Sequence, residues 1–390
     1  MRIYLDHNAT TPIAPSVLEI LIAAQREQFG NASSVHSFGQ IAKSLVDDAR
    51  ASVASLIGGR PQEIIFTSGG TESDNLAIRG VAETAASSKR RRLIVSSIEH
   101  EAVLNTVKAL GKVGWSTTFL PVNDRGIVFP EALSEAITDD TALVSVMHAN
   151  NEIGTVQPIP ELAGITHRYG ALFHTDAVQS TGKIPVSVDA LDVDLLSLSS
   201  HKFNGPKGVG ALWVKRGSRL AATMTGGRQE RNRRAGTENV PGISALGAAA
   251  RLAEKKLATR GERATAELRN RLETGVLANV PGTVLNGNGA DRVPNTTNIS
   301  FDRVEAESLL IALDLEGIAV STGSACSSGT LEPSHVLRAM GLSPHRTQNS
   351  IRFSLGLDNT TAQIDHVIKI MPRIVEKLRT LSRSGSPVRS

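Results

Sequence analysis

The sequence predicts an α/β protein with a mainly parallel sheet, and three observations support this. Short apolar runs alternate with longer amphipathic stretches between about residues 60 and 215. The runs are continuous and do not alternate with polar residues, which is typical of strands covered on both faces. Strands that alternate with helices indicate a mainly parallel sheet. With 390 residues, the chain also exceeds what one hydrophobic core usually supports, so two domains are expected.

Six apolar runs in this part of the chain are predicted strands. They read E-I-I-F-T-S (63–68), R-L-I-V-S-S (92–97), A-L-V-S-V-M-H (142–148), A-L-F-H-T-D (171–176), D-L-L-S-L-S-S (194–200) and G-A-L-W-V (210–214). Helices are predicted between the early strands, over residues 71–84 and 100–110, because apolar side chains recur there with helical spacing.

The pattern changes near residue 243. A long stretch over 243–280, rich in Ala, Glu, Arg and Leu, predicts helix, and a final helix is predicted near 361–381. Between them lie predicted strands at 295–301, 318–322 and 350–355. We therefore expect a smaller α+β domain, followed by a disordered tail with the sequence S-R-S-G-S-P-V-R-S.

The composition is that of an ordinary soluble globular protein, with 40% hydrophobic and 21% charged residues. A net charge of +4 and only 3% aromatic residues give no basis for nucleic-acid binding. The N-terminal stretch has no apolar core of a signal peptide, and no run approaches the ~18 apolar residues of a membrane span. One cysteine cannot form an internal disulfide. We expect a cytoplasmic protein with no membrane or nucleic-acid partner.

Polar residues follow the predicted strands, at the edge where open α/β sheets bind ligands. The stretch S-G-G-T (68–71) opens a helix and would suit a phosphate, although Gly-Gly before a helix is more often a plain turn. Asp176 ends a strand, and a buried Asp implies a cation or a strong donor beside it. Other polar residues at strand ends, which alone are typical of turns or surfaces, are Glu99, His100, Asn150, Asn151, Glu152 and Gln179.

Lys202 stands out because it follows a largely apolar strand and two serines. That setting would remove water from its amine, lower the amine pKa and leave it nucleophilic. Lys207, in a G-P-K-G turn, looks like a solvated surface lysine. Ser199 and His201 beside Lys202 could complete an anion site with Thr71.

These parts match the needs of pyridoxal phosphate, which are a lysine for the Schiff base, an acid for the pyridinium nitrogen and a phosphate anchor. A nicotinamide site would need G-x-G-x-x-G, and an NTPase would need G-x-x-x-x-G-K-[ST]. Neither motif follows a predicted strand here. Pyridoxal phosphate is therefore the predicted cofactor.

Eight stretches that together span nearly the whole sequence carry recognisable motifs. They are D-H-N-A-T-T-P (6–12), T-S-G-G-T-E-S-D-N-L-A-I (67–78), E-H-E-A-V-L-N (99–105), H-A-N-N-E-I-G-T-V-Q-P-I (148–159), H-T-D-A-V-Q-S-T-G-K-I-P (174–185), S-S-H-K-F-N-G-P-K-G-V-G (199–210), R-R-A-G-T-E-N-V (233–240) and G-S-A-C-S-S-G-T-L-E-P-S-H-V-L (323–337). This set of motifs resembles class I cysteine desulfurases of the NifS/IscS type.

The resemblance implies fold type I of the pyridoxal-phosphate enzymes, with a mainly parallel seven-stranded sheet in a large domain. That domain would span residues 13–255 and bind the cofactor. Residues 1–12 and 256–380 would form the smaller α+β domain that carries the cysteine loop, and 381–390 would be a disordered tail.

The resemblance also implies roles for individual residues. Lys202 would hold the cofactor, Asp176 would pair with its ring nitrogen and Gln179 with its ring hydroxyl. His100 would stack on the ring and shuttle protons. The phosphate would be bound by Gly70, Thr71, Ser199 and His201, and by Thr237 of a second subunit in a homodimer. Asn151, at the cofactor, and Arg352 would hold the substrate carboxylate, for which Arg is the usual planar clamp.

The only cysteine, Cys326, lies among Gly, Ser, Thr and Ala, although a lone buried thiol normally has apolar neighbours. The resemblance supplies a reason for this placement. Cys326 would take sulfur from L-cysteine as a persulfide, leave L-alanine, and deliver the sulfur to an acceptor such as an iron–sulfur scaffold protein. No resident metal is implied, and Cys326 is a candidate transient ligand of an iron–sulfur cluster.

Two alternatives remain open on the sequence. One is another pyridoxal-phosphate enzyme, either an aminotransferase, which would need no Cys326, or a selenocysteine lyase. The other is a sulfur-relay or cluster-assembly scaffold without turnover, which would lack absorbance near ~420 nm. His7 and the C-S-S-G stretch depart from the family pattern, and both could alter substrate access.

Overall fold

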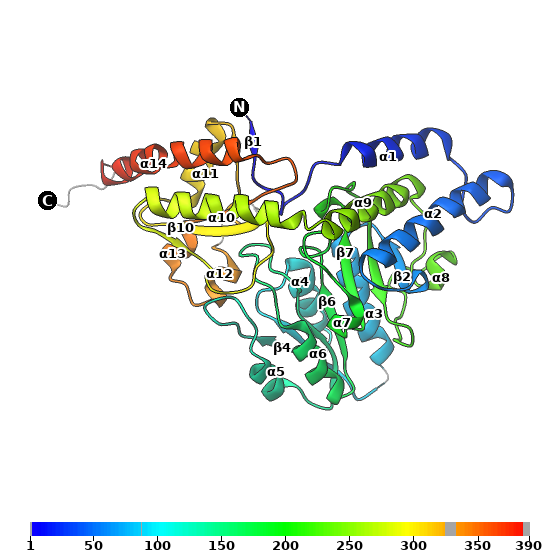
Figure 1. The fold of residues 1–390 in the computed structure, drawn as a ribbon. Helices are drawn as coiled ribbons and strands as arrows, with labels where there is room; N and C mark the ends of the chain where they lie inside the picture. The colour runs from blue at the N-terminus through cyan, green and yellow to red at the C-terminus, as the bar shows by residue number, and fades with distance from the viewer. Residues whose placement is uncertain (1, 87, 324–332, 385–390) are drawn as a thin grey trace.

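The structure is a computed structural model that describes residues 2–86, 88–323 and 333–384 (Figure 1). Its largest element is a seven-stranded sheet whose strands, in spatial order, are β2 (Ile64–Thr67), β8 (Gly210–Val214), β7 (Leu195–Ser199), β6 (Leu172–Asp176), β5 (Thr141–Ser145), β3 (Arg92–Ser96) and β4 (Ser116–Leu120). All neighbours are parallel except β8, which is antiparallel to both β2 and β7. The predicted α/β fold with a mainly parallel sheet is confirmed.

In the seven-stranded sheet, the strand that the apolar runs did not predict is β4. Its sequence S-T-T-F-L is partly polar, and most of its residues are exposed or half-buried. Because β4 lies at one edge of the sheet, it needs no continuous apolar run, and polar edge residues limit unwanted pairing.

Helices cover both faces of this sheet, each over its own hydrophobic cluster. One face packs against α3 (Gly70–Ala85) and α4 (Glu101–Gly111). The other face packs against α2 (Ser37–Leu56), α6 (Ile159–Arg168) and α9 (Val240–Ala258). The remaining helical elements of this part are α1 (Pro15–Glu27), η1 (Pro61–Glu63), α5 (Pro130–Ala136), α7 (Val188–Leu191), η2 (Ser200–Lys202) and α8 (Gln229–Asn232).

Helices α2 and α9 lie side by side at very close range. A Cβ at Gly247 of α9 would stand 2.6 Å from the Cα of Ala49 in α2. Only glycine permits this approach, because the Cβ of any other residue would clash with the α2 backbone.

A second sheet, with three antiparallel strands, lies in the C-terminal third. Its order is β12 (Ser350–Ser354), β10 (Thr296–Phe301) and β9 (Thr283–Leu285). It shares a separate core with α10 (Glu262–Asn279), α11 (Ala306–Leu315) and α14 (Thr361–Ser384), and with the short parallel pair β1 (Ile3–Tyr4) and β11 (Ile318–Ala319). Two short helices, α12 (His335–Ala339) and α13 (Pro344–Gln348), complete this part.

Two sequence boundaries differ from the structure in this region. The helical stretch predicted over 243–280 is two helices, since α9 ends at Ala258 and Arg260 takes a left-handed φ of 54° before α10 begins. The last helix, α14, ends at Ser384, three residues past its predicted end, and the rest of the predicted tail lies outside the described residues.

The N-terminal segment joins the two sheets. Figure 1 shows it passing from β1, beside the C-terminal helices, to α1, which lies beside α9. His7 N donates to the Ser354 carbonyl at 3.1 Å, and Thr11 N donates to the His201 carbonyl at 2.9 Å. No helix in the described part of the chain is long and apolar enough to cross a membrane.

Candidate active site

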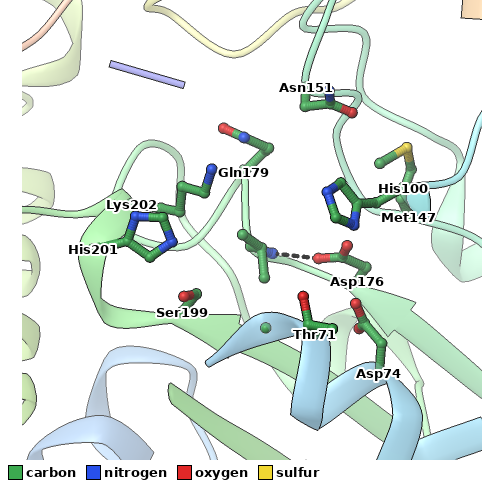
Figure 2. Close-up of a pocket in the computed structure, with 12 residues that line it drawn as sticks. Thr71, Asp74, His100, Met147, Asn151, Asp176, Gln179, Ser199, His201 and Lys202 are labelled. Atoms are coloured by element: carbon green, nitrogen blue, oxygen red, sulfur yellow. Dashed lines mark hydrogen bonds between the residues drawn. The ribbon is translucent and has the colours of Figure 1, made fainter. Parts of the chain in front are cut away.

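A cavity with an empty volume of about 640 Å³ lies at the carboxyl edge of the seven-stranded sheet (Figure 2). The parallel strands bring their final residues to this edge, so segments far apart in sequence meet there. Predicted site residues that line it are Gly70, Thr71, His100, Asn151, Asp176, Gln179, Ser199, His201 and Lys202. The lining residues that the sequence did not single out are Asp74, Met147 and Val178.

The start of α3 forms an anion-binding corner of the cavity. Its N-cap is Gly69, with φ at 153°, and no side chain among the described residues caps the first backbone N–H groups of this 16-residue helix. A Cβ at Gly70 would stand 2.8 Å from Cγ2 of Val178, so the helix start lies closely against the strand end. Uncapped N–H groups and the helix dipole favour an anion such as phosphate. Thr71 and Ser199 line the same cavity.

His201 lies beside this corner, and its Nδ1 is hydrogen-bonded to Oγ1 of Thr10 at 3.1 Å. Burial lowers the pKa of His201 to about 4, and the charge of Lys202 adds to the effect. The imidazole is therefore neutral near pH 7 and can offer one N–H to an anion.

Two buried carboxyl groups lie on one side of the cavity (Figure 2). Asp176 Oδ1 accepts a hydrogen bond from Val178 N at 2.8 Å, and Oδ2 receives none from the residues that the structure describes. Burial raises the pKa of Asp176, and His100 opposes the rise. Burial, followed by the charge of Asp176, raises the pKa of Asp74 well above its usual value. A cationic ligand at Oδ2 would relieve this cost and keep Asp176 charged.

His100 extends into the cavity beside Asp176 (Figure 2). It is also the N-cap of α4, since its Nδ1 accepts a hydrogen bond from Ala102 N at 3.1 Å. Because Nδ1 accepts, the neutral ring carries its proton on Nε2. Burial lowers the pKa of His100, whereas the charge of Asp176 opposes this. The ring can therefore stack on a flat ligand and present an N–H donor.

Lys202 faces Asp176 from another side of the cavity (Figure 2). Its Nζ donates to the carbonyl oxygens of Asn8, at 2.6 Å, and Ala9, at 2.9 Å. Burial lowers the pKa of Lys202 to about 8, and the charge of Arg352 contributes, while Asp176 and Asp6 oppose the shift. A substantial neutral fraction near pH 8 makes this amine a nucleophile and a base.

Gln179 is held by a second buried lysine that the sequence did not single out. Lys183 Nζ donates to Oε1 of Gln179 at 2.6 Å, so the amide NH₂ lies on the other side and donates to the Asn8 carbonyl at 3.0 Å. Burial lowers the pKa of Lys183 well below its usual value, and the charge of Lys202 adds to this.

Arg352, on β12, lies next to the cavity without lining it. Its Nη2 donates to Oδ1 of Asp6 at 2.6 Å, and its Nη1 donates to the Asn151 carbonyl at 3.0 Å. The Arg352 Nε is buried and has no hydrogen-bond partner in the described structure. An unused guanidinium donor beside Asn151 suits a ligand carboxylate.

Besides Arg352, the predicted site residue Thr237 does not line the cavity of this chain. Thr237 is exposed, and it lines a separate hollow with Arg234, which pairs with Glu72 of α3 at 2.7 Å. Its role in a second subunit stays a prediction. Cys326 lies outside the described residues.

The described residues on both sides of the cysteine segment contact the rim of the site. Ser321 exchanges two backbone hydrogen bonds with Arg352, at 2.7 and 3.2 Å. On the other side, Ser334 Oγ donates to Oε2 of Glu152 at 2.5 Å. Glu152 is the residue after Asn151, so both ends of the segment are fixed near Asn151 and Arg352.

The donor set fits pyridoxal phosphate. Lys202 offers the amine, Asp176 offers a free carboxylate oxygen, and the uncapped start of α3 offers a phosphate site. Within residues 2–86, 88–323 and 333–384, no group of three or more His, Cys, Asp or Glu could hold a metal ion.

Comparison with known proteins agrees with this chemistry. Residues 3–367 match the family model described as aminotransferase class V. The chain is 50% identical over 381 residues to cysteine desulfurase IscS of Dictyoglomus turgidum, covering 98% of this chain and 96% of that protein. It is 50% identical over 380 residues to a cysteine desulfurase of a Nostoc species, covering 97% and 94%. A solved NifS-like protein has 39% identity and a TM-score of 0.89, covering 97% of this chain and 100% of that one.

Proposed function

The chain belongs to the aminotransferase class V family and is a pyridoxal-phosphate-dependent cysteine desulfurase, and from that premise we propose which residues carry the reaction. Its substrate is L-cysteine. The observation that supports the assignment most is the meeting of Lys202, Asp176 and the uncapped start of α3 around one cavity.

Bound pyridoxal phosphate supplies the electron sink for bond breaking at the substrate's α and β carbons. Lys202 would carry the cofactor through its amine, and Asp176 Oδ2 would stabilise the positive charge of the ring nitrogen. The amide NH₂ of Gln179 would donate to the ring oxygen, and His100 would stack on the ring. Gly70, Thr71, Ser199 and His201 would hold the phosphate.

Asn151 and Arg352 bind the substrate carboxylate, and Asn151 also contacts the cofactor. The buried Nε of Arg352 supports this role, because a carboxylate would give that atom its missing partner. Once the substrate amine has replaced that of Lys202 on the cofactor, the freed amine of Lys202 would remove the proton from the substrate α carbon. A pKa of about 8 leaves part of the amine neutral at pH 7 to 8, as a base requires. His100 moves protons with its Nε2 on the ring side of the cavity.

Cys326 is the nucleophile for sulfur. Its thiolate attacks the substrate sulfur, the bond between that sulfur and the β carbon breaks, and the sulfur remains on Cys326 as a persulfide. The organic fragment takes up protons and leaves as L-alanine, so L-cysteine and one protein thiol give L-alanine and one persulfide. The contacts of Ser321 and Ser334 at the rim support this role, since they anchor the segment that carries Cys326.

We further propose that the enzyme is a homodimer in which Thr237 reaches the phosphate of the partner subunit. The segment before Thr237 is fixed by a buried ion pair, in which Arg50 donates to Glu230 with two bonds of 2.8 Å. Glu230 and the next two residues have left-handed φ angles, which are costly unless they are held in place. Exposed apolar side chains on α1, α2 and their connection also support an interface: Leu18, Ile22, Phe29, Val35, Phe38 and Ile41.

The location and the sulfur acceptor are also part of the proposal. A catalytic thiol needs a reducing compartment, which supports the cytoplasm. An iron–sulfur scaffold protein is the proposed acceptor, as the resemblance to desulfurases of the NifS/IscS type implies. The separate core around β10 and β12 supports the division into a large domain of residues 13–255 and a small one of 1–12 and 256–380.

Mass spectrometry of the single thiol tests the proposed function. After incubation with L-cysteine and without reductant, the protein should gain sulfur on Cys326 alone. A Cys326→Ala variant should bind cofactor normally and show its spectral change with L-cysteine, but alanine release should collapse, because the chain has no second thiol. Alanine release at near the wild-type rate by this variant would refute the persulfide step.

A further inference from the structure

Asn8 lies where the two sheets meet, in the segment between β1 and α1, and its side chain is 1% exposed. We propose that Asn8 is a positioning residue that fixes the amine of Lys202 relative to the carboxylate clamp of Asn151 and Arg352. The clamp in this statement rests on the proposed function, whereas the contact to Lys202 does not.

On the cofactor side, the backbone carbonyl of Asn8 accepts from two groups of the cavity. Lys202 Nζ donates to it at 2.6 Å, and Gln179 Nε2 donates at 3.0 Å. The Asn8 side-chain Oδ1 accepts from Lys183 Nζ at 3.0 Å, and Lys183 in turn orients Gln179. One residue therefore holds the free lysine amine and, directly and through Lys183, the amide beside it.

On the substrate side, Asn8 Nδ2 donates to the Asn151 carbonyl at 3.0 Å. Nη1 of Arg352 donates to the same carbonyl at 3.0 Å. Two positions before Asn8, Asp6 binds the other arm of Arg352 at 2.6 Å. The three-residue stretch 6–8 thus contacts both halves of the clamp as well as Lys202.

The C-terminal sheet fixes Asn8 itself. Its N donates to Ser354 Oγ at 2.9 Å, its Nδ2 donates to Thr296 Oγ1 at 2.8 Å, and its Oδ1 accepts from Asn295 Nδ2 at 3.0 Å. An asparagine amide has two N–H donors and an oxygen with two lone pairs, and here both donors and both lone pairs are used. Aspartate would lose both donors and alanine would lose all four bonds.

The proposal concerns the position of the Lys202 amine relative to the clamp. A reacting group displaced by about 1 Å can cost about a hundredfold in rate, even when the changed residue never touches the substrate. Asn8 does not touch the clamp atoms that would meet substrate, since it binds only the carbonyl of Asn151. Its effect must therefore pass through Lys202, Asn151 and Arg352.

The experiment compares Asn8→Ala and Asn8→Asp with Asn286→Ala. Each variant is the full chain, loaded with cofactor and in the oligomeric state in which it is purified. Asn286 is also 1% exposed and fully hydrogen-bonded, but all its partners lie in the C-terminal part, and none of them lines the cavity. It therefore controls for the loss of a buried amide. The measurements are KM and kcat for L-cysteine, the Kd of L-alanine from the cofactor absorbance, the rate at which stripped protein rebinds pyridoxal phosphate, and the melting temperature.

Asn8→Ala should raise KM and the Kd of L-alanine about tenfold and slow cofactor rebinding about tenfold, whereas Asn286→Ala should leave all of these within about twofold. Asn8→Asp keeps the acceptor for Lys183 but loses the donor to Asn151, so the Kd of L-alanine should rise while cofactor rebinding changes less. This variant has nearly the wild-type shape and serves if Asn8→Ala does not fold.

Three outcomes are separable. Normal L-alanine binding and normal cofactor rebinding in Asn8→Asp and Asn8→Ala would overturn the positioning role. Equal changes in the Asn8 and Asn286 variants would reduce Asn8 to a structural residue and overturn it as well. If Arg352→Ala binds L-alanine normally while Asn8→Ala still rebinds cofactor slowly, the clamp assignment fails and the link from Asn8 to Lys202 stands.

Discussion

The two sheets of this enzyme both bury polar side chains, but they use them differently. In the C-terminal sheet, the Asn286 amide donates to Asn298 Oδ1 at 2.7 Å and to Ser300 Oγ at 2.9 Å. Its oxygen accepts from Arg346 Nη2 at 2.6 Å, and Ser300 and Ser350 are hydrogen-bonded to each other at 2.8 Å. We call this network closed because each of these side chains has a partner in the described structure, although Asn298 Nδ2 also donates to the Glu152 carbonyl at 3.3 Å.

At the carboxyl edge of the seven-stranded sheet, several buried polar groups are not matched in this way. Oδ1 of Asp74 and Oε2 of Glu99 have no hydrogen-bond partner among the described residues. Burial raises the pKa of Glu99 to about 8, and burial lowers that of Lys202 to about 8. Buried groups without partners and with shifted pKa values are unfavourable for folding alone, and they mark the edge that binds a ligand.

The comparison therefore separates polar burial that stabilises from polar burial that catalyses. If it holds, substitutions at the cavity edge should remove activity with little loss of stability. Substitutions in the closed network of the C-terminal sheet should do the reverse.

The largest effect is expected for Lys202→Ala, which should remove covalent attachment of the cofactor and lower kcat by about 10²–10⁴-fold or more. The melting temperature should not fall, since a costly buried amine is removed. Borohydride reduction followed by peptide mass spectrometry identifies the lysine that carries the cofactor. Lys207→Ala, an exposed lysine of the next turn, is the matched control. If the cofactor were found on Lys183 instead, the assignment of Lys202 as the cofactor lysine would be wrong.

Arg352→Ala should raise KM for L-cysteine by about tenfold or more, because a hydrogen bond from a guanidinium to a carboxylate contributes about 1.5–3 kcal/mol. Cofactor binding should change much less. Arg346→Ala removes a guanidinium from the closed network and should lower the melting temperature while KM stays constant. Steady-state kinetics of both variants decide the point, and an unchanged KM in Arg352→Ala would exclude it from the clamp.

The rate of cofactor rebinding to stripped enzyme should depend on pH through the Lys202 amine. Only the neutral amine reacts, so the rate should fall about tenfold per pH unit below pH 8 and level off above it. Arg352→Ala should move the midpoint upward, because the charge of Arg352 helps to lower the pKa of Lys202. A rate that keeps rising to pH 10 would mean an ordinary, solvated lysine.

The smallest effect on activity is expected for Asn286→Ala. It should cost about 1–3 kcal/mol in the free energy of unfolding, since buried partners lose their hydrogen bonds. The kcat should stay within about twofold of wild type. Urea unfolding and steady-state kinetics of the same preparation measure both quantities. A large drop in kcat with normal stability would contradict the proposed difference between the two sheets.

Much of the candidate site could be predicted from the sequence, because its residues follow apolar runs that indicate strands. Asp176 and Lys202 follow apolar runs, and the parallel sheet brings such ends together. Asp74 was within reach too, because it lies three and four residues before Ala77 and Ile78 on the buried face of α3.

Asn8 and Lys183 could not be found in the same way. Lys183 follows no strand, and its burial depends on a partner 175 positions away. Asn8 lies in a segment without helical or strand periodicity, and its partner Ser354 is 346 positions away. Such contacts are set by tertiary packing, which no local pattern reports.

The separation of Asn8 and Ser354 in the sequence also affects the order in which the site forms during synthesis. Asn8 leaves the ribosome near the start of synthesis and Ser354 near its end, and at about 5–20 residues per second roughly 20–70 s pass between them. Until β12 is made, the Asn8 carbonyl that accepts from Lys202 and Gln179 lacks the contact that fixes Asn8 to Ser354. We therefore expect ribosome-bound chains halted before residue 350 to bind the cofactor more slowly than the complete protein does.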